Sequence, residues 1–241
     1  MTHRLYTDLA EWWPLLSERE SHAAEAEHIL SLLDGVLGGT ALRILELGAG
    51  GGMLASHIDS DREVVLTDIS SKMVNLAAQH NPGRRVLEGD MRSMRLGETF
   101  DAVLLHDAVM YLTSRADLFA AVQTAAAHLR PGGVFLMMPD VLKETFEEQT
   151  LSGGTTGVPA AQLMEWHWDA DPSDDTYQVE MCLLLRDKDH SVRVVHEQHT
   201  MGLFSTMTYI DALRGANLEV IRDLVWDDQL VAEAFCGRRS A

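Results

Sequence analysis

Between residues 42 and 139, short apolar runs alternate with stretches in which apolar residues recur at helical spacing. The apolar runs predict strands at 42–47, 63–68, 84–90, 100–106 and 134–139. The intervening periodic stretches predict helices at 53–58, 71–80 and 116–129. An alternation of this kind is typical of a parallel sheet that is covered by helices on both faces.

The segments on either side of this core follow other patterns. Before it, residues 17–34 have helical periodicity, and glycines stop the helix after Asp34. After it, the sequence SGGTTG predicts a flexible connection at 152–157, and polar turns separate three expected antiparallel strands at 165–171, 176–187 and 192–204. The chain is then expected to finish with a helix at 207–215 and strands at 217–226 and 230–237, joined by Asp227-Asp228-Gln229. We therefore predict an α/β fold: a doubly wound, mostly parallel seven-stranded sheet with an antiparallel insertion between the fifth strand and the last helix.

The charge balance favours a small-molecule ligand over a nucleic acid. The 241 residues include 37 acidic and 19 basic side chains, for a formal net charge of −18. The densest basic runs are the pairs Arg84-Arg85 and Arg238-Arg239, which are too short for a phosphate-backbone patch.

The sequence also predicts a cytoplasmic protein without a membrane segment. No apolar run approaches the roughly 18 residues that span a bilayer, and the first residues lack the apolar core of a secretory signal. Cys182 and Cys236 are far apart and form no CxxC motif, so two reduced thiols are expected. Whether two copies associate as a homodimer is left open.

Each predicted parallel strand ends in residues that are able to bind a ligand. The first is followed by a glycine-rich turn, ELGAGGG at 46–52, and the second ends at Asp68. The third ends at Asp90, and the fourth at His106-Asp107. In open parallel sheets ligands bind beyond the carboxyl ends of the strands, and an acid that closes the second strand can accept both hydroxyls of a ribose.

Two kinds of cofactor fit a glycine turn that is followed by such an acid. A dinucleotide needs GxGxxG or GxGxxA, but counting from Gly48 the third position is Met53. Glu46 would repel a pyrophosphate, whereas it can orient a ligand that carries an ammonium group. These two residues disfavour an oxidoreductase that uses a dinucleotide.

Four motifs together resemble the class I S-adenosylmethionine-dependent methyltransferases: ExGxGxG at 46–52, Asp68, GDM at 89–91 and RPGG at 130–133. The resemblance spans residues 40–140 and implies a Rossmann-like methyltransferase fold. It also implies a division into three parts, which are the lid helix with the cofactor-binding half (1–140), an antiparallel substrate cap (141–205), and the last helix with the closing strand pair (206–241).

The resemblance implies a role for each motif residue in binding S-adenosylmethionine. Gly48, Ala49 and Gly50 would pack against its methionine part, and Glu46 would support that loop and the methionine amine. Asp68 would bind the ribose. The remaining residues would contact the adenine (Ile69, Met73, Asp90 and the Met91 backbone) or lie beside the methionine chain or sulfonium (His106, Asp107).

The flanks are similar to a subgroup that methylates small molecules and includes N,N-dimethyltransferases of nucleotide-linked amino sugars. The shared features are the Ala23–Ala26 helix start, the strand insertion at 163–204 and the segment from His196 to Phe204. Tyr111 occupies the position of that subgroup's active-site histidine, and Glu11-Trp12-Trp13-Pro14 replaces its N-terminal aromatic segment. The acceptor is therefore not carried over.

Several further side chains are candidates for the acceptor side. His106 and Tyr111 are the expected proton acceptors. Trp12 and Trp13 form a lid over the sulfonium or pack in the core, and Trp166 and Trp168 share a strand face that packs on the sheet or covers the substrate pocket. His196 and His199 face opposite sides of a strand, so no metal site is expected.

These observations predict a methyltransferase that acts on a small molecule, most plausibly at an amine nitrogen. Methylation of a small carboxylate or hydroxyl oxygen is the alternative within the same class. A non-catalytic S-adenosylmethionine-binding protein is the alternative from another class, and the acidic charge disfavours a macromolecular substrate.

Overall fold

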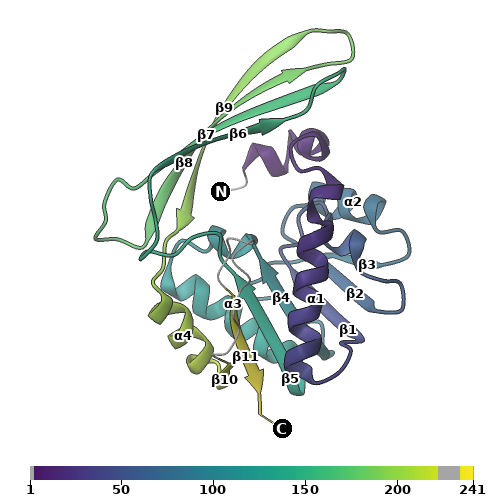
Figure 1. The fold of residues 1–241 in the computed structure, drawn as a ribbon, viewed down its shortest axis with the longest axis vertical. Helices are drawn as coiled ribbons and strands as arrows, with labels where there is room; N and C mark the ends of the chain where they lie inside the picture. Colours follow the sequence, from purple (N-terminus) through teal and green to yellow (C-terminus); the bar gives the residue numbers. More distant parts are fainter. Residues whose placement is uncertain (1–2, 222–233, 241) are drawn as a thin grey trace.

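The computed structural model describes residues 3–221 and 234–240, which form two sheets and four α-helices. Sheet A has seven strands in the order β10-β11-β5-β4-β1-β2-β3 (Figure 1). Its strands are β1 (Arg43–Leu47), β2 (Glu63–Asp68), β3 (Arg85–Glu88), β4 (Phe100–His106), β5 (Leu129–Met138), β10 (Leu218–Ile221) and β11 (Phe235–Arg239). β1 to β5 pair in parallel and β11 pairs antiparallel to both β5 and β10, which confirms the predicted fold class.

Alternate residues of the central strands enter two separate cores. Ile44, Leu66 and Leu104 pack with α1 (Ala23–Leu37) on one face of sheet A. Leu45 and Val103 pack on the other face with α3 (Arg115–His128) and α4 (Thr206–Gly215). Both sides of these strands are buried, which explains why their sequences read as continuous apolar runs.

Side chains and glycine set the ends of the helices, but α1 continues through Gly35, three residues beyond the predicted stop after Asp34. A serine directly precedes α2 (Ser71–His80), α3 and α4, and its side chain accepts a hydrogen bond from the backbone N–H three residues further on. These capping residues are Ser70, Ser114 and Ser205. α1 ends at Gly38, which has a left-handed φ of 69°. The expected helix at 53–58 contains only a short 3₁₀ helix, η4 (Ala55–His57), and the first turn of the expected helix at 17–34 is η3 (Arg19–His22).

Sheet B is an antiparallel sheet of four strands, one more than the sequence predicts. Its order is β6 (Gln149–Gly154), β7 (Ala160–Trp168), β8 (Thr176–Arg186) and β9 (Val192–Gly202). The expectation of a flexible connection is wrong for residues 152–154, which pair with β7. All six residues of β6 are exposed and two are glycines, so no burial pattern marks the strand.

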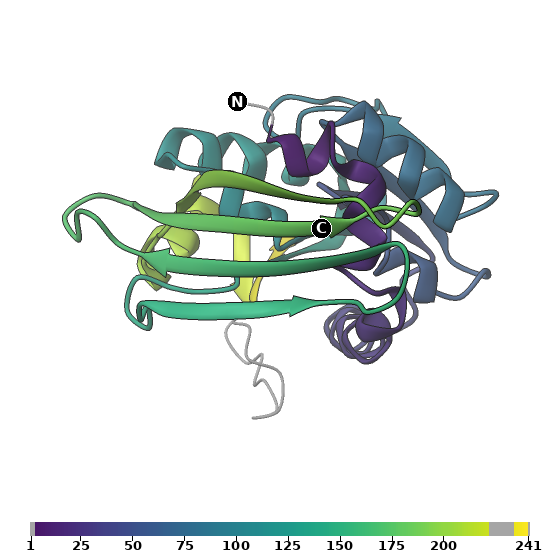
Figure 2. The ribbon, with the colours of Figure 1, turned by 90° about the horizontal axis from the view of Figure 1, so that it is seen from above.

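Sheet B lies across the carboxyl edge of sheet A, with the N-terminal 3₁₀ helices η1 (Arg4–Tyr6) and η2 (Ala10–Leu15) beside it (Figure 1; Figure 2 from above). Residues 130–133 are part of β5, and a register shift between Phe100 and Ala102 absorbs the irregularity. The expected turn Asp227-Asp228-Gln229 lies outside the described residues. No helix in the described ranges combines the length and apolar character needed to cross a bilayer.

Candidate functional site

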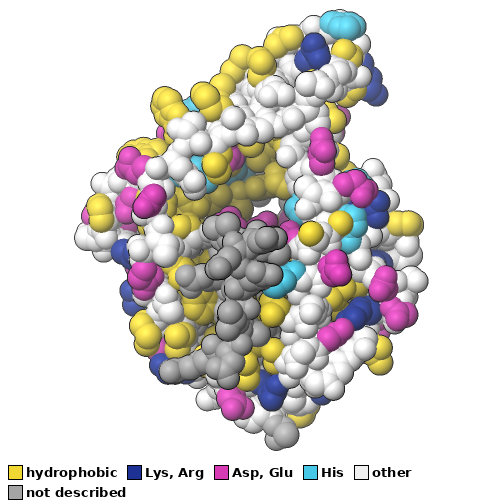
Figure 3. All heavy atoms as spheres, viewed as in Figure 1, with side chains coloured by type: hydrophobic (Ala, Val, Ile, Leu, Met, Phe, Trp, Pro, Cys, Tyr) yellow, Lys and Arg dark blue, Asp and Glu magenta, His cyan; other side chains and the backbone are white. Residues whose placement is uncertain are grey.

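A cavity of about 930 Å³ separates the carboxyl edge of sheet A from the inner face of sheet B. Figure 3 shows the opening between the two sheets, with acidic side chains inside it. The walls come from the strand ends of sheet A, from β7 and β8, and from η1, η2 and η5 (Ala108–Tyr111). Most of the residues that the sequence marks for cofactor binding therefore meet at one place.

The glycine turn after β1 forms one wall of the cavity. Gly48 has a φ of 71°, and a Cβ added there would lie 2.4 Å from the Ala108 Cβ. A Cβ at Gly51 would lie 2.9 Å from Trp13. Because both positions exclude a side chain, the backbone of the turn lies directly against its neighbours and faces the cavity.

Glu46 points into the cavity from the end of β1, although its side chain is buried. The residue is 4% exposed, and its Oε2 is a buried atom without a hydrogen-bond partner among the described residues. Burial raises the pKa of Glu46 to about 7, with His106 opposing the shift and Asp107 adding to it. An unpartnered buried carboxylate oxygen is costly, so this atom fits a cationic donor that is supplied by a ligand.

Asp68 holds the turn and also faces the cavity. Its Oδ2 accepts from the Gly50 N–H at 2.9 Å and its Oδ1 accepts from the Ser70 N–H at 2.8 Å. Burial raises the pKa of Asp68, while these backbone bonds oppose the shift. Each oxygen retains a lone pair, so the carboxylate can still accept from a ligand.

The residues expected around the adenine divide into two groups. Ile69, Asp90 and Met91 line the cavity, and Ile69 is 56% exposed. Asp90 is paired with Arg92 at 2.7 Å, and this hydrogen bond holds the pKa of its carboxyl low. Met73 is fully buried in α2 and does not line the cavity, so the expected adenine contact by Met73 is not supported.

His106 lies at the end of β4 between two carboxylates. Its Nε2 is 2.9 Å from Glu25 Oε1 and 2.9 Å from Asp107 Oδ1. Burial opposes the charged imidazole, but the two carboxylates outweigh it and raise the pKa of His106 well above its usual range. Asp107 adopts a φ of 46°, which is strained for a residue with a side chain.

Comparisons with known proteins agree with this geometry. A methyltransferase domain model matches residues 44–133, which contain the glycine turn and the carboxyl ends of β1 to β4. A dTDP-3-amino-3,6-dideoxy-alpha-D-glucopyranose N,N-dimethyltransferase from Streptomyces fradiae is 29% identical over 75% of this chain and 71% of that protein. The protein is an S-adenosylmethionine-dependent methyltransferase.

Two solved structures extend the similarity of this methyltransferase over nearly its whole length. DesVI from Streptomyces venezuelae superposes with a TM-score of 0.83 at 25% identity, covering 98% of both chains. An amino pentose methyltransferase from Micromonospora echinaspora, solved with bound S-adenosylmethionine, gives a TM-score of 0.78 at 25% identity over 91% of this chain and 92% of that one. The cofactor of this methyltransferase is S-adenosylmethionine, and the unpartnered Glu46 oxygen fits its ammonium group.

On the acceptor side of the methyltransferase, a chain of hydrogen bonds leads away from the cavity. The Tyr6 and Tyr111 hydroxyls, both in the cavity wall, are 2.5 Å apart. The Tyr111 hydroxyl is 3.1 Å from His199 Nδ1, and His199 Nε2 is 2.9 Å from Glu197 Oε2. His199 is fully buried, so this chain connects the cavity surface with a buried carboxylate.

The same region contains a group of possible metal ligands, namely His3, Glu197 and His199, whose ligand atoms lie within 4.8 Å of one another. Both ring nitrogens of His199 are already hydrogen-bonded, and its ring centroid lies 3.7 Å from that of His3, with the two ring planes tilted by 40°. Hydrogen bonds account for both His199 nitrogens, whereas Glu197 Oε1 is a buried atom without a hydrogen-bond partner among the described residues, and the absence of a metal remains a prediction. His196 is exposed and bonds to Glu180, so the two histidines face opposite sides as expected.

The four tryptophans named from the sequence do not act together. Trp13 lines the cavity, and Trp12 is buried in the core with Arg193 over its ring at 5.5 Å. Trp166 and Trp168 share a face as expected, but they line a separate hollow on the outer face of sheet B. The expectation that this face covers the substrate pocket is wrong, because the inner face of β7 carries Glu165 and His167 instead.

Four further residues line the cavity without having been predicted from the sequence: Tyr6, Asp140, Glu165 and Tyr177. The segments that contain these four residues have no sequence motif comparable to the glycine-rich turn. The alternation of Glu165 and His167 along one strand was the available signal, since residues two apart share a face.

Proposed function

We propose that the protein transfers a methyl group from S-adenosylmethionine to an amine nitrogen of a small molecule. The observation that carries this proposal is the hydrogen-bonded chain from Tyr6 to Glu197, which begins in the cavity wall and ends at a buried carboxylate. An ammonium group must lose a proton before its nitrogen can attack, and this chain offers a route for that proton. The N,N-dimethyltransferase from Streptomyces fradiae supports an amine acceptor.

We further propose how the protein holds the cofactor. The Glu46 carboxylate accepts from the methionine ammonium, Gly48, Ala49 and Gly50 lie against the methionine part, and Asp68 binds the ribose. Ile69, Asp90 and the Met91 backbone surround the adenine. Each of these residues lines the cavity.

When bound, S-adenosylmethionine supplies an activated methyl group on a positively charged sulfur. The protein's tasks are then to align the acceptor, exclude water and remove one proton. The His199 Nε2–H donates to Glu197, which leaves Nδ1 to accept from the Tyr111 hydroxyl, and Tyr111 in turn accepts from Tyr6. This polarity, assigned from the bonding pattern, directs the Tyr6 oxygen lone pairs toward a donor in the cavity.

The two proton acceptors expected from the sequence have different roles in this proposal. Tyr111 is part of the chain of hydrogen bonds. Its pKa is raised well above the usual range, mainly by burial and next by the neighbouring Tyr6, so it remains a neutral phenol. His106 is held in its charged form by Asp107 and Glu25 and is therefore a poor base. We assign His106 to ordering the carboxylates around the methionine end of the cofactor.

A panel of amines, carboxylic acids and phenols, each incubated with S-adenosylmethionine, tests the proposed function. Methylated product is expected from amines only. Turnover of a carboxylic acid or a phenol without turnover of any amine would favour the O-methyltransferase alternative. Cofactor binding without any methylated product would favour a non-catalytic binding protein.

Substitution of Asp68 tests the proposed contact between its carboxylate and the ribose of the cofactor. Asp68→Ala is expected to weaken S-adenosylhomocysteine binding about tenfold or more, on the order of 1.5–3 kcal/mol for a lost charged hydrogen bond. Isothermal titration calorimetry measures the affinity, and Asp59→Ala, an exposed acid outside the cavity, is the control. Unchanged affinity would mean that Asp68 does not bind the ribose.

We propose that this methyltransferase works in the cytoplasm as a homodimer. Cys182 and Cys236 are both free, as expected for a reducing compartment. The outer face of sheet B exposes Met164, Trp166 and Val194, which a second copy would cover. Analytical ultracentrifugation of the wild type and of Trp166→Glu tests the dimer: a wild-type monomer, or a dimer unaffected by the substitution, contradicts this interface.

A further inference from the structure

The walls of the cavity carry a strong excess of negative charge. Among the described residues that line it are seven carboxylates and one basic side chain outside the histidines. The basic side chain is Arg92, which is paired with Asp90 at 2.7 Å and with Asp117 at 3.1 Å. The carboxylates are Glu46, Asp68, Asp90, Asp107, Asp117, Asp140 and Glu165.

The cofactor residues proposed above account for Glu46, Asp68 and Asp90, and three others belong to the acceptor side. Glu165 projects from the inner face of β7, where its partner is His167 at 3.1 Å. Asp107 and Asp140 lie on the opposite wall, at the ends of β4 and β5. Desolvation and the Asp107 carboxylate raise the pKa of Asp140 well above its usual range, as expected for two acids that share a proton. Acidic groups thus lie on two sides of this part of the cavity, and His106 lies 2.9 Å from the Asp107 carboxylate.

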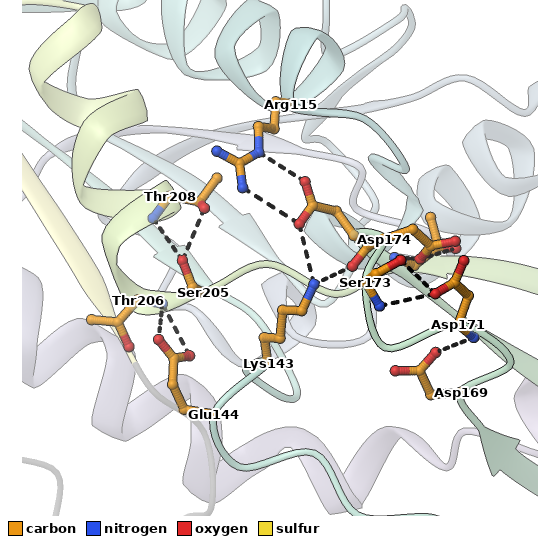
Figure 4. A network of polar contacts seen from close by, with 12 residues as sticks. Arg115, Lys143, Glu144, Asp169, Asp171, Ser173, Asp174, Ser205, Thr206 and Thr208 are labelled. Atoms are coloured by element: carbon orange, nitrogen blue, oxygen red, sulfur yellow. Dashed lines mark hydrogen bonds and ion pairs between the residues drawn. The ribbon is translucent and has the colours of Figure 1, made fainter.

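Two basic side chains near this region, Arg115 and Lys143, are paired with one of the protein's own acids. Arg115, at the start of α3, lies 2.8 Å from the Asp175 carboxylate, and Lys143, after β5, lies 3.5 Å from the same group (Figure 4). Neither Arg115 nor Lys143 lines the cavity. Residues 222–233 contribute one basic and four acidic residues to the sequence, so they do not reverse the excess of acidic over basic residues.

The N-termini of α3 and α4, next to Arg115 and Lys143, are also occupied. The Thr206 N–H, at the start of α4, donates to the Glu144 carboxylate at 3.0 and 3.2 Å (Figure 4). The first turn of α3 is capped by Ser114 and contains Asp117. Cations and free helix N-termini are the groups that bind phosphate in proteins, and in this region both kinds already have acidic or capping partners.

We propose that the acceptor is an amine without a phosphate group, bound as an ammonium ion between Glu165 and the Asp107–Asp140 pair. This inference rests on the proposed amine methylation and narrows its substrate class. The faces of Tyr6, Tyr111 and Tyr177 add an aromatic surface that is suited to a cation. The dTDP-linked substrate in the name of the Streptomyces fradiae relative carries a diphosphate, which these carboxylates would repel.

Two binding experiments on the full-length protein, loaded with S-adenosylhomocysteine, test this inference. The first is calorimetric titration with dTDP, for which no binding is expected at millimolar concentration. The second uses the best amine of the panel and the variant Glu165→Gln, which is expected to weaken amine binding about tenfold, as for one lost charge-assisted bond. Glu219→Gln, at an exposed position of β10 outside the cavity, is the control and is expected to bind the amine as the wild type does.

The outcomes separate this inference from the proposed function. Micromolar binding of dTDP, or faster turnover of a dTDP-linked amino sugar than of the free amino sugar, overturns the inference while amine methylation stands. Equal amine affinity in Glu165→Gln and the wild type also overturns it. Absence of any methylated amine in the panel overturns the proposed function instead.

Discussion

Glu46→Gln is expected to weaken S-adenosylmethionine binding about 10- to 100-fold at pH 8, because it removes a charged hydrogen-bond acceptor. Glutamine has nearly the same shape as glutamate but carries no charge. The buried Glu46 Oε2 has no partner among the described residues, so the ligand ammonium would be its first donor. Calorimetry with the wild type and Glu46→Gln measures the difference.

The pH dependence of binding gives a second, independent signature. Glu46 has a pKa of about 7 in the ligand-free protein, so below pH 7 it must lose a proton to accept from the ammonium group. Wild-type affinity is therefore expected to fall about tenfold for each pH unit below 7, and to fall again well above pH 8, where the ligand's ammonium group loses its proton. Glu46→Gln has no proton to lose at this position, so its affinity is expected to change little between pH 6 and 8.

The Glu46→Gln substitution is expected to weaken cofactor binding but to raise the stability of the ligand-free protein. The folded-state pKa of Glu46 lies above its ordinary value of 4.5, so burying the charged carboxylate lowers the free energy of unfolding. This loss of stability is absent below pH 4.5 and is complete above pH 7. Ligand-free Glu46→Gln is therefore expected to be more stable than the wild type at pH 8, by about 1–3 kcal/mol, and nearly equal at pH 5. Glu219→Gln, an exposed glutamate on β10, is the control for both measurements. A variant that binds the cofactor as tightly as the wild type at pH 8 would contradict the assignment.

The parallel core was predictable because local pattern and burial agree there. Strands such as Arg43–Leu47 and Phe100–His106 are buried on both faces, so they appear in the sequence as short apolar runs between helical stretches. Glu46, Asp68 and Asp90 were predictable for a related reason. Each occupies or directly follows the end of a parallel strand, and the topology alone brings those ends together.

The insertion and the acceptor side were only partly predictable. The strand period placed Trp166 and Trp168 on one face, but it does not say which face is covered. Apolar side chains usually point inward, yet here the inner face of β7 lines the cavity with Glu165 and His167. Tyr6 and Tyr111 are 105 residues apart, and Tyr111 and His199 are 88 apart, so no local pattern connects them.

The other large effect is expected at His199, which receives the proton in the proposed mechanism. His199→Gln is expected to lower kcat about 100-fold or more at pH 7, within the range for loss of a positioned proton acceptor. The amide cannot take up the proton that Tyr111 passes on. Tyr111→Phe breaks the same chain at its hydroxyl and is expected to show a loss of similar size.

The pH profile distinguishes a lost proton acceptor from a merely damaged pocket. At high pH more of the amine is already neutral, so the His199→Gln deficit is expected to shrink about tenfold per pH unit up to the pKa of the amine. A structural defect would lower kcat equally at every pH. S-adenosylhomocysteine affinity is expected to be unchanged, since His199 does not line the cavity.

His196→Gln is the matched control for this experiment. The substitution is the same, and the residue lies on the same strand, but its side chain faces outward and bonds to Glu180. Its kcat and pH profile are expected to equal those of the wild type, because nothing on the outer face of sheet B connects to Tyr111. Wild-type kcat in His199→Gln at pH 7, or a deficit that does not depend on pH, would show that the proton leaves by another route.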